Sequence, residues 1–210
     1  MTERGLARAV RVMDRLRSPG GCPWDAQQTH RSLAKYLLEE AYEAVDAIGG
    51  SDPEHLKEEL GDVLLQVLFH ARIAQESADG FDIDDVADAL SDKLERRHPH
   101  VFGDTQVSGA DEVDANWEQI KAAEQQRTGT YEGLVWGAPS LAVAAAALRR
   151  AARAGEDLQV ARDGAEGEVA ADLLAVVRRA GELGVDAETA LRGALRAATA
   201  TSASNPTARA

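Results

Sequence analysis

Apolar residues recur every three or four positions through most of the chain, and this spacing restricts its fold more than any other feature. Such spacing puts the apolar side chains on one face of an α-helix, whereas a half-buried strand would alternate. The stripes predict helices within residues 6–16, 33–48, 56–76, 86–94, 113–120, 140–154, 167–183 and 186–199. Residues 98–102 could be extended, but no convincing alternating pattern is found. We therefore predict an all-α protein.

The composition of the 210-residue chain changes after its middle. Residues 140–210 contain nine Arg and nine Asp or Glu, and 23 of them are Ala. The formal net charge of −13 therefore belongs to residues 1–139, which also hold all nine aromatic residues. A turn-like run at 129–139 marks the boundary. We predict a first domain over 1–128, a linker over 129–139, an Ala-rich helical part over 140–200 and a disordered tail over 201–210.

Charge and cysteine content exclude several classes of protein. A sequence pI of about 4.8 argues against binding to nucleic-acid polymers or to anionic membranes, because both need basic surface. Cys22 is the only cysteine and cannot form an internal disulfide, which suits the cytoplasm. The N-terminal residues lack the apolar core of a secretory signal, and no apolar run reaches the ~18 residues of a membrane span. We expect a cytoplasmic protein.

Acidic residues are concentrated on two consecutive predicted helices. The first carries Glu39, Glu40 and Glu43, and the second carries Glu59 and Asp62. On a helical projection both acidic rows flank apolar stripes, whose centres we place at Leu37 and Leu60. The short connection at 49–54 makes the helices antiparallel neighbours, so the acids come together and repel one another. A hard cation such as Mg²⁺ or Mn²⁺ would relieve this repulsion; the alternative is a solvated acidic surface.

The spacing of these acids is also that of a known signature. Glu39-Glu40-x-x-Glu43, fifteen residues, then Glu59-x-x-Asp62 resembles the EExxE…ExxD signature of all-α nucleoside triphosphate pyrophosphohydrolases. Five segments of the chain resemble the MazG branch of that superfamily: residues 22–29 (CPWDAQQT), 37–43 (LLEEAYE), 58–62 (EELGD), 93–102 (KLERRHPHVF) and 117–121 (WEQIK). The resemblance covers nearly all of residues 1–127. It implies a MazG-like helical bundle completed by dimerisation and a divalent-metal enzyme, which cleaves an NTP or dNTP between the α and β phosphates to a monophosphate and pyrophosphate.

The resemblance implies a role for each matching residue. The expected Mg²⁺ ligands are Glu40, Glu43, Glu59 and Asp62. Glu39 matches an additional acid, which binds a further ion or orients the attacking water. The candidate contacts to the outer phosphates are Lys93, Arg96, Arg97 and Lys121, although the same residues could be ordinary surface charge. Trp24 either stacks on the base or anchors its loop in a buried position.

Other polar residues receive less weight. Gln66 and His70 continue the acidic side of the second helix, and either could line the pocket. His98 and His100 are weak metal-ligand candidates, for which a structural or pocket-edge role is favoured. Cys22 has no evident neighbour that would activate its thiolate.

The Ala-rich part resembles a shortened, degenerate second MazG copy. Asp172 aligns with Asp62, but Val169 replaces the partner acid and no EExxE run precedes it. We therefore expect no metal site there; the alternative is a plain Ala-rich helical extension.

For the whole chain, the rival function is a non-catalytic MazG-like interaction or regulatory protein. A di-iron site is disfavoured, because it needs Glu-x-x-His twice and only Glu95–His98 offers it.

Overall fold

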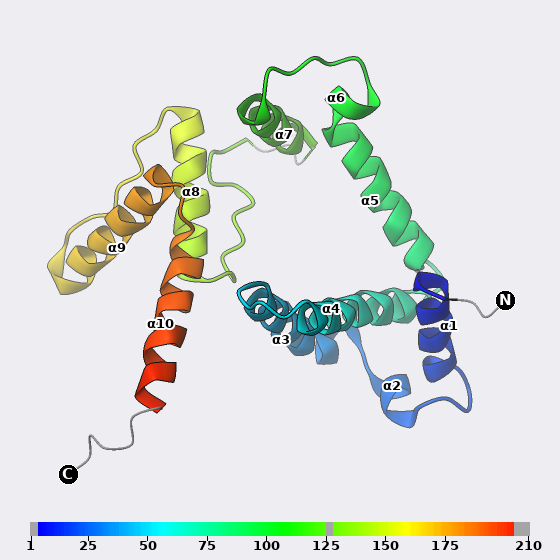
Figure 1. The fold of residues 1–210 in the computed structure, drawn as a ribbon. Coiled ribbons are helices and arrows are strands. Elements are labelled where there is room, and N and C mark those ends of the chain that lie inside the picture. The colour runs from blue at the N-terminus through cyan, green and yellow to red at the C-terminus, as the bar shows by residue number, and fades with distance from the viewer. Residues whose placement is uncertain (1–3, 125–127, 204–210) are drawn as a thin grey trace, which may run out of the picture. The chain divides into compact units, whose positions relative to one another are not determined.

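The computed structural model describes residues 4–124 and 128–203, and every regular element in these ranges is a helix. The prediction of an all-α protein is therefore confirmed. In chain order the helices are α1 (Leu6–Arg17), α2 (Pro23–Gln27), α3 (His30–Ile48), α4 (Pro53–Ala74), α5 (Ile83–Arg97), α6 (Pro99–Phe102), α7 (Ala110–Glu124), α8 (Ser140–Ala154), α9 (Gly164–Glu182) and α10 (Ala187–Ala203) (Figure 1). None of the described helices is both long and apolar enough to cross a membrane.

The chain divides into two compact units, and the division falls inside α7. The first unit ends at Trp117 and contains α1 to α6 with the start of α7. The second unit begins at Glu118 and contains the rest of α7 with α8, α9 and α10. The predicted linker at 129–139 therefore lies within the second unit. Of the predicted tail, residues 201–203 belong to α10, and residues 204–210 lie outside the described residues.

Helices α3 and α4 form the framework of the first unit, and the local sequence sets their ends. Thr29 caps α3 through a reciprocal pair of hydrogen bonds with Ser32. Gly49 follows the last residue of α3, Asp52 caps α4, and Pro53 takes the first helical position. A connection this short makes the helices antiparallel, and their contact is the most extensive between any two described helices (Figure 1).

A small apolar core holds the other helices of this unit against α4. Met13 of α1, Leu33 of α3, and Leu68 and Phe69 of α4 are almost completely buried together. Ile83, the first residue of α5, packs against the same cluster. The core therefore fixes α1, α3 and the beginning of α5 on α4, which places the acidic parts of α3 and α4 in a defined register.

Two short helices differ from what the periodicity predicts. Residues 23–27 form α2, with Pro23 in the first turn; five residues are too few to show an apolar period. The suggestion that residues 98–102 are extended was wrong, because they include α6. Pro99 cannot continue α5 but can start a new helical turn, so the chain bends at His98 and remains helical.

In the second unit, α8, α9 and α10 contact one another pairwise. The segment before α8 is tied to this unit by side-chain hydrogen bonds. The hydroxyls of Thr130 and Tyr131 donate to the carboxylate of Glu156, and Arg150 donates to the carbonyl of Gly133. The second unit therefore extends before the Ala-rich helices, and these hydrogen bonds tie the predicted linker to it.

Candidate metal centre

Three carboxylates from α3 and α4 meet in the first unit. One carboxylate oxygen from each of Glu40, Glu43 and Glu59 lies within 4.8 Å of the other two. Glu40 and Glu59 are half-buried, whereas Glu43 is exposed, so the cluster is reached from solvent on the side of Glu43. The structure thus brings together three of the four residues expected to bind the metal ion. We call Glu40, Glu43 and Glu59 the acid cluster.

The acid cluster lies in the contact between the two helices. On α3, Glu40 shares a face with the buried residues Leu33, Ala44 and Ala47. On α4, Glu59 and Asp62 share a face with the buried residue Gln66. Leu37 and Leu60, the predicted centres of the apolar stripes, are 37% and 52% exposed, so the contact between α3 and α4 does not cover them fully. The apolar stripes are wider than the area that the pairing of α3 with α4 covers.

The helix pair consequently has two different flanks. At 100° per residue, Glu43 lies about 60° to one side of Glu40, and Asp62 lies about 40° to the same side of Gln66. Because the helices are antiparallel, the same sense of rotation leads to the same side of the pair; we call this side the acid flank. The opposite side, the apolar flank, carries exposed aliphatic residues: Leu37, Val45 and Ile48 of α3, and Leu60, Leu64 and Val67 of α4.

Burial and the neighbouring acids disfavour the ionised form of Glu40. The pKa of Glu40 is raised, first by burial and then by the negative charges of Asp62, Glu43 and Glu39. Glu59 Oε1 lies 3.3 Å from His55 Nδ1, whereas Glu59 Oε2 is buried and has no hydrogen-bond partner in the described part of the chain. A buried carboxylate oxygen without a hydrogen-bond partner destabilises the folded protein, and a bound ligand can remove this destabilisation.

The donor set fits a hard divalent cation. It consists of carboxylate oxygens alone, which suit Mg²⁺ or Mn²⁺. It also includes an oxygen of Glu59 that lacks a protein partner. Asp62 and Glu39 lie outside the group of three but are near enough to affect the pKa of Glu40. Their predicted roles as a fourth ligand and as an additional acid stay predictions.

The predicted phosphate-binding residues lie on other helices. Lys93 and Arg97 of α5 are half-buried, and the Arg97 guanidinium lies 5.4 Å from the centre of the Trp117 ring. Arg96 is exposed and donates to the carbonyl of Asp92. Lys121 lies in the second unit, with its Nζ 3.8 Å from Glu118 Oε1. Contact of these residues with phosphate stays a prediction.

The remaining candidates are placed as follows. Trp24 of α2 is 51% exposed, and its ring meets the rings of Tyr36 and Phe69 edge-on, with centroids 6.3 and 6.4 Å away. His98 packs against the rings of Trp117 and His100, with centroids at 4.9 and 5.6 Å. These contacts give His98 and His100 a packing role. Cys22 is half-buried at the start of α2.

Sequence reasoning missed His30, the first residue of α3. Its Nδ1 lies 2.8 Å from Nδ1 of His70 on α4, and the two rings are parallel within 2°. Burial, and then the neighbouring His30, lower the pKa of His70. The antiparallel register could have identified this pair, because the register that joins Glu43 to Glu59 also puts His30 opposite His70.

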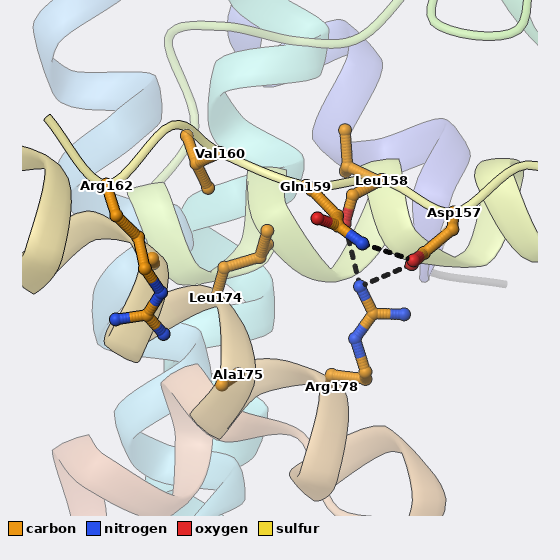
Figure 2. Close-up of a pocket in the computed structure, with 9 residues that line it drawn as sticks. Asp157, Leu158, Gln159, Val160, Arg162, Leu174, Ala175 and Arg178 are labelled. Carbon is orange, nitrogen blue, oxygen red and sulfur yellow. Dashed lines mark hydrogen bonds and ion pairs between the residues drawn. The ribbon is translucent and has the colours of Figure 1, made fainter.

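A pocket in the second unit offers no comparable site. This pocket, of about 360 Å³, lies between α9 and the segment before it (Figure 2). Arg178 forms an ion pair with Asp157 at 3.1 Å and donates to the carbonyl of Leu158. Arg162 pairs with Glu168 and with Asp172, at 2.6 and 3.1 Å. Both guanidinium groups of the pocket are thus already neutralised, and Asp172 is paired with a cation.

Comparison with known proteins finds similarity over most of the chain. Residues 28–102 match the family model of the MazG nucleotide pyrophosphohydrolase domain. The chain is 42% identical over 222 aligned residues to the nucleoside triphosphate pyrophosphohydrolase/pyrophosphatase MazG of Thermotoga maritima, covering 93% of this chain and 84% of that protein. It is 50% identical to an uncharacterized 26.1 kDa protein of Streptomyces cacaoi, covering 90% of this chain and 77% of that protein.

A further relative is longer. The nucleoside triphosphate pyrophosphohydrolase of Escherichia coli (strain K12) is 49% identical over 130 residues, which are 61% of this chain and 49% of that protein. The chain thus matches about half the length of this relative.

The fold and the acid cluster define a class of helical proteins with carboxylates gathered between two antiparallel helices. Within that class, the similarity over most of the chain identifies the family: this chain belongs to the MazG family.

Proposed function

We propose that this protein hydrolyses nucleoside or deoxynucleoside triphosphates between the α and β phosphates, giving a monophosphate and pyrophosphate. The observation that supports this most is the acid cluster, in which three carboxylate oxygens lie within 4.8 Å between two packed helices. The relatives from Escherichia coli and Thermotoga maritima are named as nucleoside triphosphate pyrophosphohydrolases, and the similarity to the Thermotoga maritima protein covers 93% of this chain. The biological role that we infer is removal of unwanted nucleotides from the pool.

We further propose that Glu40, Glu43, Glu59 and Asp62 hold a divalent cation, Mg²⁺ or alternatively Mn²⁺. When bound, the cation supplies charge neutralisation for the triphosphate and lowers the pKa of a coordinated water. The partial burial of Glu40 keeps its carboxylate in the contact between α3 and α4, where the cation would bind. Glu59 offers an oxygen without a protein partner, and His55 orients the other oxygen of the same carboxylate.

The remaining residues are assigned by charge and position. Glu39 is exposed beside the cluster, so its carboxylate is available to orient a water molecule or to bind a further ion. Lys93, Arg96 and Arg97 provide three cations within about a turn of α5, a suitable arrangement for the outer phosphates. Lys121 is proposed for the same role from the sequence alone.

We propose that the protein forms a homodimer or a higher homo-oligomer through the apolar flank. Leu60 and Ile48 are 52% and 64% exposed there, and a row of exposed aliphatic residues on two packed helices is typical of an interface. A second copy of the chain would cover this row and leave the acid flank open.

We place the protein in the cytoplasm, since its one cysteine cannot form an internal disulfide.

The experiment that tests the proposal is pyrophosphate release from a panel of NTPs and dNTPs, titrated with Mg²⁺ and Mn²⁺. We expect release that saturates with the metal and disappears with a chelator. No release from any nucleotide, together with an intact fold, would favour the alternative of a non-catalytic MazG-like interaction protein.

Light scattering on the same sample measures the oligomeric state, and a monomer at micromolar concentration would contradict the proposed interface.

A further inference from the structure

One buried polar side chain in the first unit has no partner for its acceptor. Gln66 of α4 is only 4% exposed, yet its Oε1 has no hydrogen bond within the described residues. A buried amide oxygen without a partner destabilises the folded protein unless a ligand or water binds to it. The Oε1 atom of Gln66 therefore needs a bound ligand or a water molecule as its partner.

Gln66 lies directly beside the acid cluster along α4. It follows Asp62 by four residues, which is about 6 Å along the helix axis. Glu59, Asp62 and Gln66 fall within about 60° of one another at 100° per residue, so they form a single row that faces α3. A molecule bound at the carboxylates and extending along this row toward the end of α4 would meet the amide of Gln66 next.

An aromatic surface borders the same position. Trp24 contacts Tyr36 of α3 and Phe69 of α4 and is half exposed. Tyr36 lies about 40° from Glu40, and Phe69 about 60° from Gln66, both toward the acid flank. Trp24 therefore borders the helix pair on the acid flank and not on the apolar flank, near the level of Gln66.

We propose that Gln66 and Trp24 form the nucleobase end of the substrate site, a step that rests on the proposed function. Gln66 Oε1 accepts a hydrogen bond from an amino or ring N–H of the base, and the indole of Trp24 stacks on the base. The ligand is a purine or pyrimidine base attached, through its sugar, to phosphates at the acid cluster. The rival occupant of the Gln66 site is a structural water, which would also satisfy the amide.

The test separates recognition of the base from recognition of the phosphates. The variants are Gln66→Met, which keeps the size of the buried side chain without its polar group, and Trp24→Leu, with Trp24→Phe as the conservative variant. Gln75→Met is the matched control, because Gln75 is exposed and lies about 180° around the helix from Gln66. For each protein we would measure kcat and KM for ATP, GTP, CTP and UTP, and the inhibition constant of inorganic tripolyphosphate with Mg²⁺.

We expect Gln66→Met to raise KM by about three- to tenfold, the loss of one neutral hydrogen bond, while the inhibition constant of tripolyphosphate changes by less than about twofold. Its melting temperature should stay the same or rise, because a buried acceptor without a partner has been removed. Trp24→Leu should raise KM by about five- to a hundredfold, with recovery in Trp24→Phe. Gln75→Met should resemble the wild type.

Two outcomes would overturn the inference and leave the proposed function intact. The first is an active Gln66→Met variant with an unchanged KM, which would assign the amide to a structural water. The second is an equal weakening of nucleotide and tripolyphosphate, which would show that Gln66 supports the phosphate end or the fold. A wild-type protein that hydrolyses no nucleotide would overturn the proposed function, and this inference with it.

Discussion

The buried guanidinium of Arg17 and the carboxylate of Glu76 form two parallel hydrogen bonds, Nε to Oε1 at 2.9 Å and Nη2 to Oε2 at 2.8 Å. The Arg17 side chain is 3% exposed, and it also donates to the backbone carbonyls of Asp25 and Gln28. One ion pair thus joins the end of α1, the α2 segment and the chain just after α4. It holds the α2 segment, which carries Trp24, near α4.

The first prediction concerns this ion pair. The hydrogen bond from Arg17 lowers the pKa of Glu76 below its usual 4.5, and the charges of Arg17 and Arg72 act in the same direction. The folded state therefore binds a proton at Glu76 less readily than the unfolded state, so the pair stabilises the fold above pH 4.5. This stability is lost as the pH falls through the lowered pKa.

We expect Glu76→Gln to unfold at a temperature about 2–4 °C lower at pH 7, corresponding to about 1 kcal/mol once the partial exposure of Glu76 is considered. Below pH 4.5 the difference from the wild type should shrink. Thermal unfolding by circular dichroism between pH 3 and pH 7 is the measurement. A difference that stays constant over this range would contradict the assignment of the ion pair.

A second prediction concerns repulsion in the acid cluster. Burial raises the pKa of Glu40, as do Asp62, Glu43 and Glu39, so the folded state binds a proton at Glu40 more readily than the unfolded state. The ionised form therefore destabilises the metal-free protein as the pH rises through the raised pKa. Glu40→Gln should raise the melting temperature of the metal-free protein at pH 7, remove its stabilisation by Mg²⁺, and lower hydrolysis by roughly a hundredfold or more.

The matched control for Glu40→Gln is Glu58→Gln, an exposed acid of α4 outside the acid cluster. It should change neither hydrolysis nor stabilisation by Mg²⁺. If Glu40→Gln lowered the melting temperature and kept normal turnover, Glu40 would be part of a structural network and not a metal ligand.

The sequence predicts the helices and the acids well, but it does not predict which residues face one another. Apolar spacing is a local property, so α3 and α4 follow from it directly. Leu37 and Leu60 are the centres of the apolar stripes, whereas the structure puts Glu40 and Gln66 on the faces by which α3 and α4 contact each other. An apolar stripe that packs against another helix of the same chain has the same spacing in the sequence as a stripe that packs against a second copy of the protein. The pair of His30 and His70 depends on helix register, which apolar spacing alone does not give.

A third prediction concerns the proposed degenerate copy. Asp172 is exposed and pairs with Arg162 at 3.1 Å, so it has a cationic partner in place of further acids. Asp172→Ala should change pyrophosphate release by less than about twofold, and it should change the melting temperature little, because an exposed ion pair stabilises a protein weakly. Steady-state turnover and thermal unfolding are the measurements. Loss of turnover with an unchanged melting temperature would show that the active site draws on the second unit.

The identity of the products tests the proposed reaction most directly. The wild-type protein would be incubated with one nucleoside triphosphate and Mg²⁺, and the products separated by anion-exchange chromatography. We predict a nucleoside monophosphate and pyrophosphate in equal amounts, with neither formed in the presence of a chelator and far less of both formed by Glu40→Gln. A nucleoside diphosphate and inorganic phosphate would contradict cleavage between the α and β phosphates.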